Sequence, residues 1–265
     1  MKTTFIGMAT VLLEIGGTRI LTDPVLDPKG SAYKLGKSGL VRYVNEAGPA
    51  LPSAELGDVD IALVSHDQHK DNLDRSGREF LKSVGDTVTT TTGAARLKSR
   101  HGISTTGLKP WQHHDVTLKD GSNLRITATP ARHGPPVIAP LVAGPVIGFL
   151  LEWPGFKNGS VYLTGDTRLY SGVNTVARKF TVGTVMINLG AGQFSATGST
   201  CYSMTAKEGV ECAKLFPAAK IVPLHFEGWS HLSQSRADVE QAFAIAGMSE
   251  RLIWLEPGQQ IGVAA

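Results

Sequence analysis

The sequence has little cysteine and no long apolar run, and each of these absences excludes a class of protein. Only Cys201 and Cys212 occur, and they do not form a Cys-x-x-Cys pair, which excludes a disulfide scaffold and a cysteine-based metal site of that type. The apolar residues near the N-terminus are soon interrupted by Glu14, Arg19 and Asp23, unlike a secretory signal or a membrane span. We therefore expect a cytoplasmic protein without a membrane span.

Charge of one sign is not in excess either. The formal net charge is only +3 at pH 7, and the basic residues are scattered along the chain, so we expect no nucleic-acid partner. An apolar fraction of 42% with 18% charged residues is typical of a globular protein, and 30 glycines with 14 prolines indicate many turns. No repeat, low-complexity stretch or break in composition marks a boundary. We predict a single domain over residues 1–265.

The apolar pattern predicts a strand-rich start followed by alternating strands and helices. Strands are expected at 2–8, 11–15 and 18–22, with Gly16-Gly17 as a two-residue hairpin turn, and a long loop at 24–57. Later strands are expected at 59–65, 87–92, 185–189, 221–226 and 251–255, and hairpins at 116–130 and 146–166. Helices are expected at 74–83, 94–100, 205–216 and 235–246, the third of which opens with a capping box at Thr205-Ala206-Lys207-Glu208. This order favours an α/β fold.

The most informative segment runs from Ser65 to Asp74 and reads Ser-His-Asp-Gln-His-Lys-Asp-Asn-Leu-Asp. It follows an apolar strand-like stretch at 59–64 and holds both His66 and His69 among several aspartates. Neutral imidazoles and carboxylates crowded at the end of a strand are the ligands that a divalent metal needs. The segment therefore predicts a metal site.

Further apolar segments end in potential ligands in the same way. Residues 124–130 lead to His133, residues 161–165 to Asp166, residues 221–224 to His225, and residues 18–22 to Asp23. Because strand ends converge at one rim of a packed sheet, these side chains could meet in space although they are far apart in the sequence. We expect Asp23 to hold the ligand loop by hydrogen bonds.

In these motifs and their order the chain resembles the metallo-β-lactamase superfamily. It is most similar to the branch of ascorbate-6-phosphate lactonase and N-acyl-phosphatidylethanolamine phospholipase D. The motifs that carry the resemblance are Thr10–Ile15, Leu21-Thr22-Asp23-Pro24, Ser65–Asp74, His133, Thr164-Gly165-Asp166-Thr167 and His225. The resemblance implies a four-layer αββα sandwich with the site at one edge.

The chain departs from this family pattern at two places. The family has His-x-His-x-Asp-His, whereas His66 and His69 are three residues apart, so one residue is inserted. Aligned from the Asn-Leu-Asp end, His69 matches the second histidine, Asp71 the aspartate, and Asn72 stands where the family has its last histidine. Met8 replaces the histidine of the opening Gly-His-Ala-Thr that many relatives carry.

The resemblance also implies the metal ligands. One ion would be held by His66, His69 and His133, and a second by Asp71 and His225, with Asp166 bridging. Asn72 is a poorer ligand than imidazole, and Asp67 and His231 are the candidates to replace the lost donor. Whether one or two ions are bound stays open. Zinc is the metal expected first, with manganese or iron as alternatives.

The resemblance implies hydrolysis by a metal-activated water. Asp71 would orient the nucleophile or accept its proton, and His231 would donate to a substrate oxygen. We expect a small-molecule ester or lactone as substrate, with a phosphodiester second, and Arg132 and Arg168 as candidates to bind an anionic group. A metal-binding protein without hydrolase activity stays open, as does a homo-oligomer.

A second enzyme class and one further segment bear on the function. A flavin-linked diiron oxidoreductase shares the fold and ligand type, but it needs a flavodoxin-like domain for which we see no room. The stretch from His225 to His231 either lines a pocket, with Glu227 or His231 touching substrate, or is a loop that Trp229 pins to the core.

Overall fold

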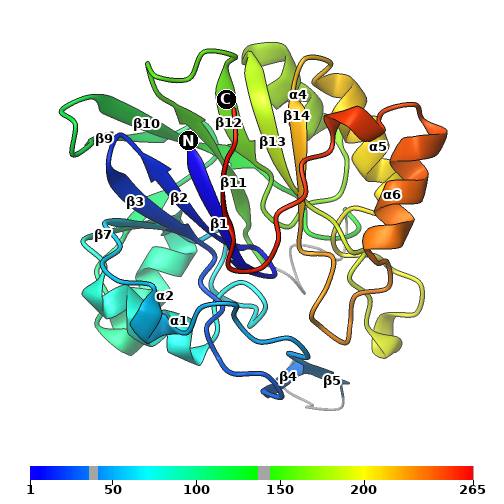
Figure 1. Ribbon diagram of the computed structural model, residues 1–265. Coiled ribbons are helices and arrows are strands. Elements are labelled where there is room, and N and C mark those ends of the chain that lie inside the picture. Colours follow the sequence, from blue (N-terminus) through cyan, green and yellow to red (C-terminus); the bar gives the residue numbers. More distant parts are fainter. Residues whose placement is uncertain (36–40, 137–143, 265) are drawn as a thin grey trace.

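Two β-sheets lie face to face in the computed structural model, with helices on both outer surfaces (Figure 1). The structure describes residues 1–35, 41–136 and 144–264. The first sheet has the strand order β15-β1-β2-β3-β6-β7-β8. Its strands are β1 Lys2–Gly7, β2 Thr10–Ile15, β3 Thr18–Thr22, β6 Ile61–Leu63, β7 Asp86–Thr90, β8 Thr106–Leu108 and β15 Gln260–Gly262.

The turn between β2 and β3 follows the sequence prediction. Gly16 and Gly17 have φ angles of 54° and 75°, values that only glycine adopts readily and that a tight hairpin turn requires. From β3 onward this sheet becomes parallel, because β3 pairs with β6, β6 with β7, and β7 with β8 in parallel register. The carboxyl ends of β3 and β6 therefore lie at the same edge.

The second sheet has the order β14-β13-β12-β11-β10-β9. Its strands are β9 His113–Thr117, β10 Asn123–Pro130, β11 Ile147–Glu152, β12 Ser160–Leu163, β13 Val182–Asn188 and β14 Lys220–Leu224. Strands β9 to β12 form the two predicted antiparallel hairpins, whereas β12, β13 and β14 are parallel. The carboxyl ends of β10, β12, β13 and β14 thus share one edge.

Apolar side chains fill the space between the sheets. Leu13 and Ile20 from the first sheet and Ile126, Phe149 and Leu151 from the second belong to one buried cluster. The outer face of the first sheet carries α1 Arg75–Phe80 and α2 Thr91–His101, and that of the second carries α4 Ser171–Lys179, α5 Ala206–Leu215 and α6 Arg236–Ile245 (Figure 1). This is the four-layer αββα sandwich that the motifs predicted.

Helix α5 shows how local sequence sets an element. The Thr205 hydroxyl accepts a hydrogen bond from Glu208 N, and the Glu208 carboxylate accepts one from Thr205 N, which is the predicted capping box. Val210 on α5 and Phe243 on α6 are then buried against the second sheet in one cluster. Apolar burial of this kind, more than propensity, stabilises short helices.

Three sequence expectations were wrong in part. Residues 24–57 include a small hairpin, β4 Ala32–Leu35 with β5 Val41–Val44, and a 3-10 turn at Ser53–Glu55, although 36–40 lie outside the described residues. Helix α4 was missed because Tyr170, its N-cap residue, offers no side-chain cap as a signal. The closing strand expected at 251–255 is wrong: only Leu252 makes a bridge there, and β15 is the last strand.

Candidate metal centre

The predicted ligands follow strands whose ends meet at one edge of the two sheets. His66 comes after β6, His133 after β10, Asp166 after β12 and His225 after β14. The two sheets bring these ends together because β6 feeds into the loop that packs on the second sheet, where Ile147 N donates to Ser65 O at 3.1 Å.

Three imidazoles converge in a first cluster. His69 Nδ1 lies 3.1 Å from His66 Nε2 and 3.0 Å from His133 Nε2. His66 is fully buried, and His133 is 7% exposed. Nitrogen atoms at such separations, around one point and from three different side chains, have the arrangement of ligands about a shared ion with metal–nitrogen distances of about 2.0–2.1 Å.

Asp71, Asp166 and His225 form a second cluster beside the first. His225 Nε2 lies 3.4 Å from Asp166 Oδ2 and 3.6 Å from Asp71 Oδ2. Asp166 Oδ2 also lies 3.8 Å from His133 Nε2 and 4.0 Å from His66 Nε2, so this one oxygen faces both clusters. A bridging carboxylate between two ions has this position.

Buried polar atoms without partners show that these residues fit a metal. Asp166 Oδ2 and His225 Nε2 are buried, and neither forms a hydrogen bond with the residues that the structure describes. A buried polar atom left unpaired costs about 1–3 kcal/mol, more for a charged group. A cation between the clusters satisfies both atoms, and the imidazole and carboxylate donors suit a divalent ion.

The outward-facing atoms of the same side chains are held by hydrogen bonds. His66 Nδ1 lies 2.9 Å from Ser65 Oγ, which in turn donates to Asp23 Oδ2 at 2.9 Å. His133 Nδ1 lies 2.7 Å from the Tyr202 carbonyl, and Asn188 Nδ2 donates to Asp166 Oδ1 at 2.8 Å. These contacts fix the rings with Nδ1–H outward and leave each Nε2 lone pair for an ion.

Burial and neighbouring charge set the protonation of the clusters. Burial, followed by the charge of His133, lowers the pKa of His69 to about 4, and burial with His69 lowers the pKa of His66 well below its usual value. Although burial opposes ionisation of Asp166, its histidine neighbours, His225 first, lower its pKa to about 2. Neutral imidazoles and ionised carboxylates are the forms that bind metals.

The second cluster binds a proton when it holds no ion. Burial opposes a charged His225, but the carboxylates of Asp166 and Asp71 outweigh it and raise the pKa of His225 to about 9. Burial would likewise raise the pKa of Asp71, yet its close contacts with His225 and His231 hold that pKa well below its usual range.

Asp67 and His231 are the two candidates to replace the imidazole donor that Asn72 does not supply, and the structure places them differently. Among the described residues, groups of three or more ligand atoms within 4.8 Å of one another occur only in the two clusters, and neither Asp67 nor His231 belongs to one. Asp67 is paired with Arg96. His231 Nε2 lies 3.0 Å from Asp71 Oδ2, and its buried Nδ1 has no partner in the described part of the chain. Asn72 is buried and donates to Asp23 Oδ2 at 3.4 Å.

Aromatic rings line one side of the centre. The half-buried Phe194 ring stacks on His231 with centroids 5.1 Å apart, and Tyr202 lies 5.9 Å from the His133 ring. Tyr43 meets His231 edge-on at 5.2 Å. This wall presents apolar surface to anything that approaches the two clusters.

The two arginines that the sequence singled out have structural partners. Arg168 Nε donates to the Glu208 carboxylate at 2.9 Å, and its Nη1 donates to the Cys201 carbonyl at 2.8 Å. The Arg132 guanidinium lies 4.6 Å from the centroid of the Tyr170 ring. His101 and His114 lie elsewhere, at the end of α2 and on β9, where His114 contacts Asp86.

Strained backbone also gathers here. Met8, Asp23, Ala191 and His225 all have positive φ, between 33° and 58°, which non-glycine residues adopt rarely. Met8 O accepts a hydrogen bond from His225 N at 3.0 Å. Such strain persists only where surrounding contacts enforce it, and it is frequent at functional sites.

Sequence reasoning missed four supporting residues: Ser65, Asn188, Tyr202 and Arg96. Asn188 carried a usable signal, since it is a polar residue at the end of an otherwise apolar strand. The contribution of Tyr202 is a backbone carbonyl, and no side-chain pattern could have indicated it.

Comparison with known proteins finds metal-dependent hydrolases among the relatives of this chain. A metal-dependent hydrolase of Caldivirga maquilingensis is 21% identical over 259 residues, covering 98% of this chain and 96% of the relative. The N-acyl-phosphatidylethanolamine-hydrolyzing phospholipase D 1 of Caenorhabditis elegans is 28% identical over 137 residues, 49% of this chain and 37% of the relative.

The fold itself is shared with a solved structure, the isothiocyanate hydrolase from Delia radicum gut bacteria, at a TM-score of 0.83 and 22% identity over 100% of both chains. Among the described residues no helix is long and apolar enough to span a membrane. The family model of the beta-lactamase superfamily domain matches residues 18–226, which is most of the chain. The chain therefore belongs to the metallo-β-lactamase superfamily of metal-dependent hydrolases.

Proposed function

We propose that this chain cleaves an ester or lactone of a small molecule with the help of one or two divalent ions, zinc first and manganese or iron as alternatives. His66, His69 and His133 would hold one ion, and Asp71 and His225 the other, with Asp166 between them. An ion bound there supplies a Lewis acid that polarises a carbonyl and lowers the pKa of water.

The observation that carries the proposal is the pair of buried atoms Asp166 Oδ2 and His225 Nε2, which form no hydrogen bond with the described residues although they lie beside three converging imidazoles. A purely structural cluster would hydrogen-bond such atoms, because buried polar groups without a hydrogen bond are costly. Here the two atoms form only an ion pair at 3.4 Å, and Asp166 Oδ2 also lies within 4.0 Å of His66 and His133.

Asp71 and His231 have distinct roles in this proposal. The pKa of Asp71 lies well below its usual range, since its contacts with His225 and His231 outweigh burial, so the carboxylate stays ionised and orients the attacking water. His231 Nε2 contacts Asp71 at 3.0 Å, and its buried Nδ1, which has no partner among the described residues, would donate to a substrate oxygen. Geometry at hydrogen-bond distance is the first requirement for such a role.

The surroundings favour a neutral carbonyl substrate over a phosphodiester. Phe194 and Tyr202 line the centre with apolar surface, and the Arg168 side chain is already paired with Glu208. A phosphodiester remains the second candidate because Arg132 adjoins His133 and its buried Nε has no partner among the residues that the structure describes. The similarity to the phospholipase D of Caenorhabditis elegans supports the same alternative.

We propose that residues 1–265 form one catalytic domain. It would act in the cytoplasm, on a small molecule and not on nucleic acid. The termini support the single unit, because β1 pairs with β15 in the first sheet. A homo-oligomer is compatible with the proposal.

The test compares metal-loaded wild type with His133→Ala and Asp166→Ala on an aryl ester, a lactone and a bis-aryl phosphate. We expect both variants to lose turnover and metal, measured by elemental analysis. His114→Ala serves as control, since His114 lies on β9 and contacts Asp86 away from the clusters. Activity retained in Asp166→Ala without metal refutes the assignment. No cleavage by the fully loaded wild type favours a metal-binding protein.

A further inference from the structure

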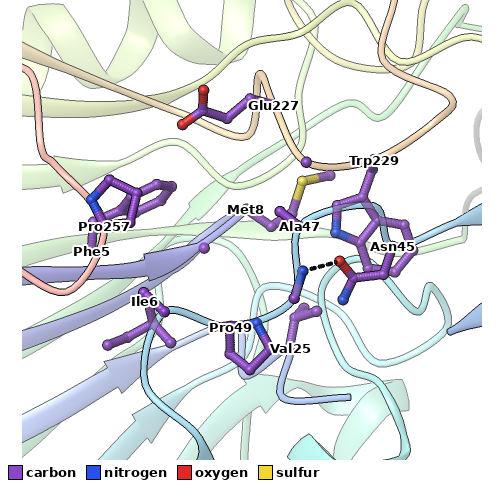
Figure 2. Close-up of a pocket in the computed structure, with 14 residues that line it drawn as sticks. Phe5, Ile6, Met8, Val25, Asn45, Ala47, Pro49, Glu227, Trp229 and Pro257 are labelled. Atoms are coloured by element: carbon purple, nitrogen blue, oxygen red, sulfur yellow. Dashed lines mark hydrogen bonds between the residues drawn. The ribbon is translucent and has the colours of Figure 1, made fainter. Parts of the chain in front are cut away.

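A cavity of about 340 Å³ lies beside the metal centre and shares no residue with the two clusters (Figure 2). It is formed by the end of β1, the loop at 45–50, the segment that follows β14, and Pro257. Its volume is at the lower end of the range of small-molecule sites, about 300–1,000 Å³. This volume admits a small ligand, but not a polypeptide chain or a β-sheet.

The body of the cavity is apolar and preformed. Phe5, Ile6, Met8, Val25 and Trp229 line it, and each is at most 4% exposed in the folded chain. Side chains buried to this degree in a packed core keep fixed positions, so a hydrocarbon group can enter without first ordering the wall.

One charged side chain of the lining is free to bind a ligand. Glu227 forms no hydrogen bond or ion pair with the residues that the structure describes. The nearby Arg236 is paired with Glu240 and Glu256 at 2.9 Å each. Figure 2 shows Glu227 on one side of the cavity, with Ile6, Pro49 and Val25 on the other.

The other polar side chain of the lining is already satisfied. Asn45 is 2% exposed, accepts a hydrogen bond from Gly48 N at 2.8 Å and donates to the Asp27 carbonyl at 3.2 Å. Glu227 is exposed where it lines the cavity, and partial burial raises its pKa, which Arg236 opposes and Glu256 reinforces. A cationic group placed against this carboxylate would give it the partner that it lacks among the described residues.

We propose that this cavity is a binding site for a small organic cation, with the hydrocarbon part against Met8 and Trp229 and the ammonium group on Glu227. The site is separate from the metal centre and does not depend on the proposed hydrolysis. It nevertheless adjoins the centre, since Met8 O accepts from His225 N at 3.0 Å and the Trp229 ring lies 6.0 Å from that of His231.

The test uses three probes of one shape and different charge: 2-phenylethylamine, 2-phenylethanol and 3-phenylpropionate. Isothermal titration of the metal-loaded full chain should show the amine binding more tightly than the alcohol, and the acid not at all. Glu227→Gln should weaken the amine about tenfold and leave the alcohol unchanged. Glu55→Gln, an exposed glutamate that does not line the cavity, is the control.

Two further measurements locate the probe. With methyl-labelled methionine, the Met8 resonance should shift on adding the amine while those of Met186 and Met204, buried elsewhere, stay in place. Ala47→Phe, which narrows the cavity from its exposed side, should abolish binding of amine and alcohol alike. Equal affinity for amine and alcohol, unchanged binding in Glu227→Gln, or a silent Met8 resonance each overturns the proposal.

Discussion

Arg96 on α2 forms an ion pair with the carboxylate of Asp67, the residue that directly follows His66. Arg96 Nε donates to Asp67 Oδ2 at 2.8 Å, Nη2 contacts the other oxygen, and Nη2 also donates to Gln68 Oε1 at 2.8 Å. The extra residue between the two histidines is thereby tied to a helix. This explains how His69 still reaches His66 despite the insertion.

Replacing Arg96 should loosen the ligand loop. We expect Arg96→Gln to lower metal affinity about 10–100-fold, the usual effect of losing a residue that orients ligands. Competition with a chromophoric chelator measures it. Arg100→Gln, an exposed arginine on the same helix, is the matched control. Equal affinities in the two variants would show that the Asp67 contact does not position the loop.

Ser65→Ala removes the hydroxyl between His66 and Asp23. Without it, His66 Nδ1 loses its partner at 2.9 Å and the ring can adopt the wrong tautomer. Metal affinity should fall about tenfold or more, and the metal-free protein should lose about 1–3 kcal/mol of stability, because His66 Nδ1 is left buried without its partner. Chelator competition and thermal unfolding are measured on the same samples. An unaltered metal affinity would contradict the orienting role of the Ser65 hydroxyl between Asp23 and His66.

Gly165 positions Asp166 by its backbone. Its φ is +59°, and a Cβ there would lie 2.6 Å from Ile147 O. Gly165→Ala should therefore lower the free energy of unfolding by about 1–3 kcal/mol and reduce metal binding. Gly102→Ala is the control, because Gly102 has a similar φ of +70° with no atom within 4 Å of the added Cβ. Denaturant unfolding and elemental analysis compare the two; a similar loss in both variants would rule out the clash.

His225→Ala should show whether the two clusters bind separate ions. It leaves His66, His69 and His133 intact, so we expect metal content to fall from about two ions per chain to about one. Loss of all metal would mean that a single ion is shared by both clusters. Elemental analysis after gel filtration gives the count.

Asp74 should make stability depend on pH. Burial raises its pKa from 3.8 to about 6, against hydrogen bonds from Asp27 N and Gly77 N. Because the folded state holds this proton more tightly, its contribution is complete below about pH 4 and is lost as the pH rises through 6. The wild type should lose about 3 kcal/mol relative to Asp74→Asn over that interval.

Urea unfolding of both proteins at several pH values from 4 to 8 tests this difference. An asparagine side chain at position 74 cannot accept both backbone hydrogen bonds. This changes the free energy of unfolding of the variant by an amount that does not vary with pH. A difference between the proteins that stays flat across the interval would contradict the raised pKa.

Local patterns sufficed where an element carries its own signal. The Gly16-Gly17 turn and the Thr205–Glu208 capping box lie where predicted, because both depend on residues adjacent in the chain. Helix α4 lacks such a cap, and its buried Val173 and Val176 acquire meaning only against the second sheet. The segment at 251–255 has the apolar run of a buried strand, yet it makes only the bridge at Leu252 to the second sheet, and Leu252 and Trp254 pack on the cluster between that sheet and the helices.

The sequence alone determined the family, the order of the strands that end in ligands, and the residue types at those ends, since ligand chemistry resides in the side chains themselves. The tertiary structure decided which of these atoms face one another. It paired Asp67 with Arg96, set His231 against Asp71 and left Asp166 Oδ2 between two clusters. Distances between residues far apart in the chain depend on how two sheets pack, and that is a property of the whole core.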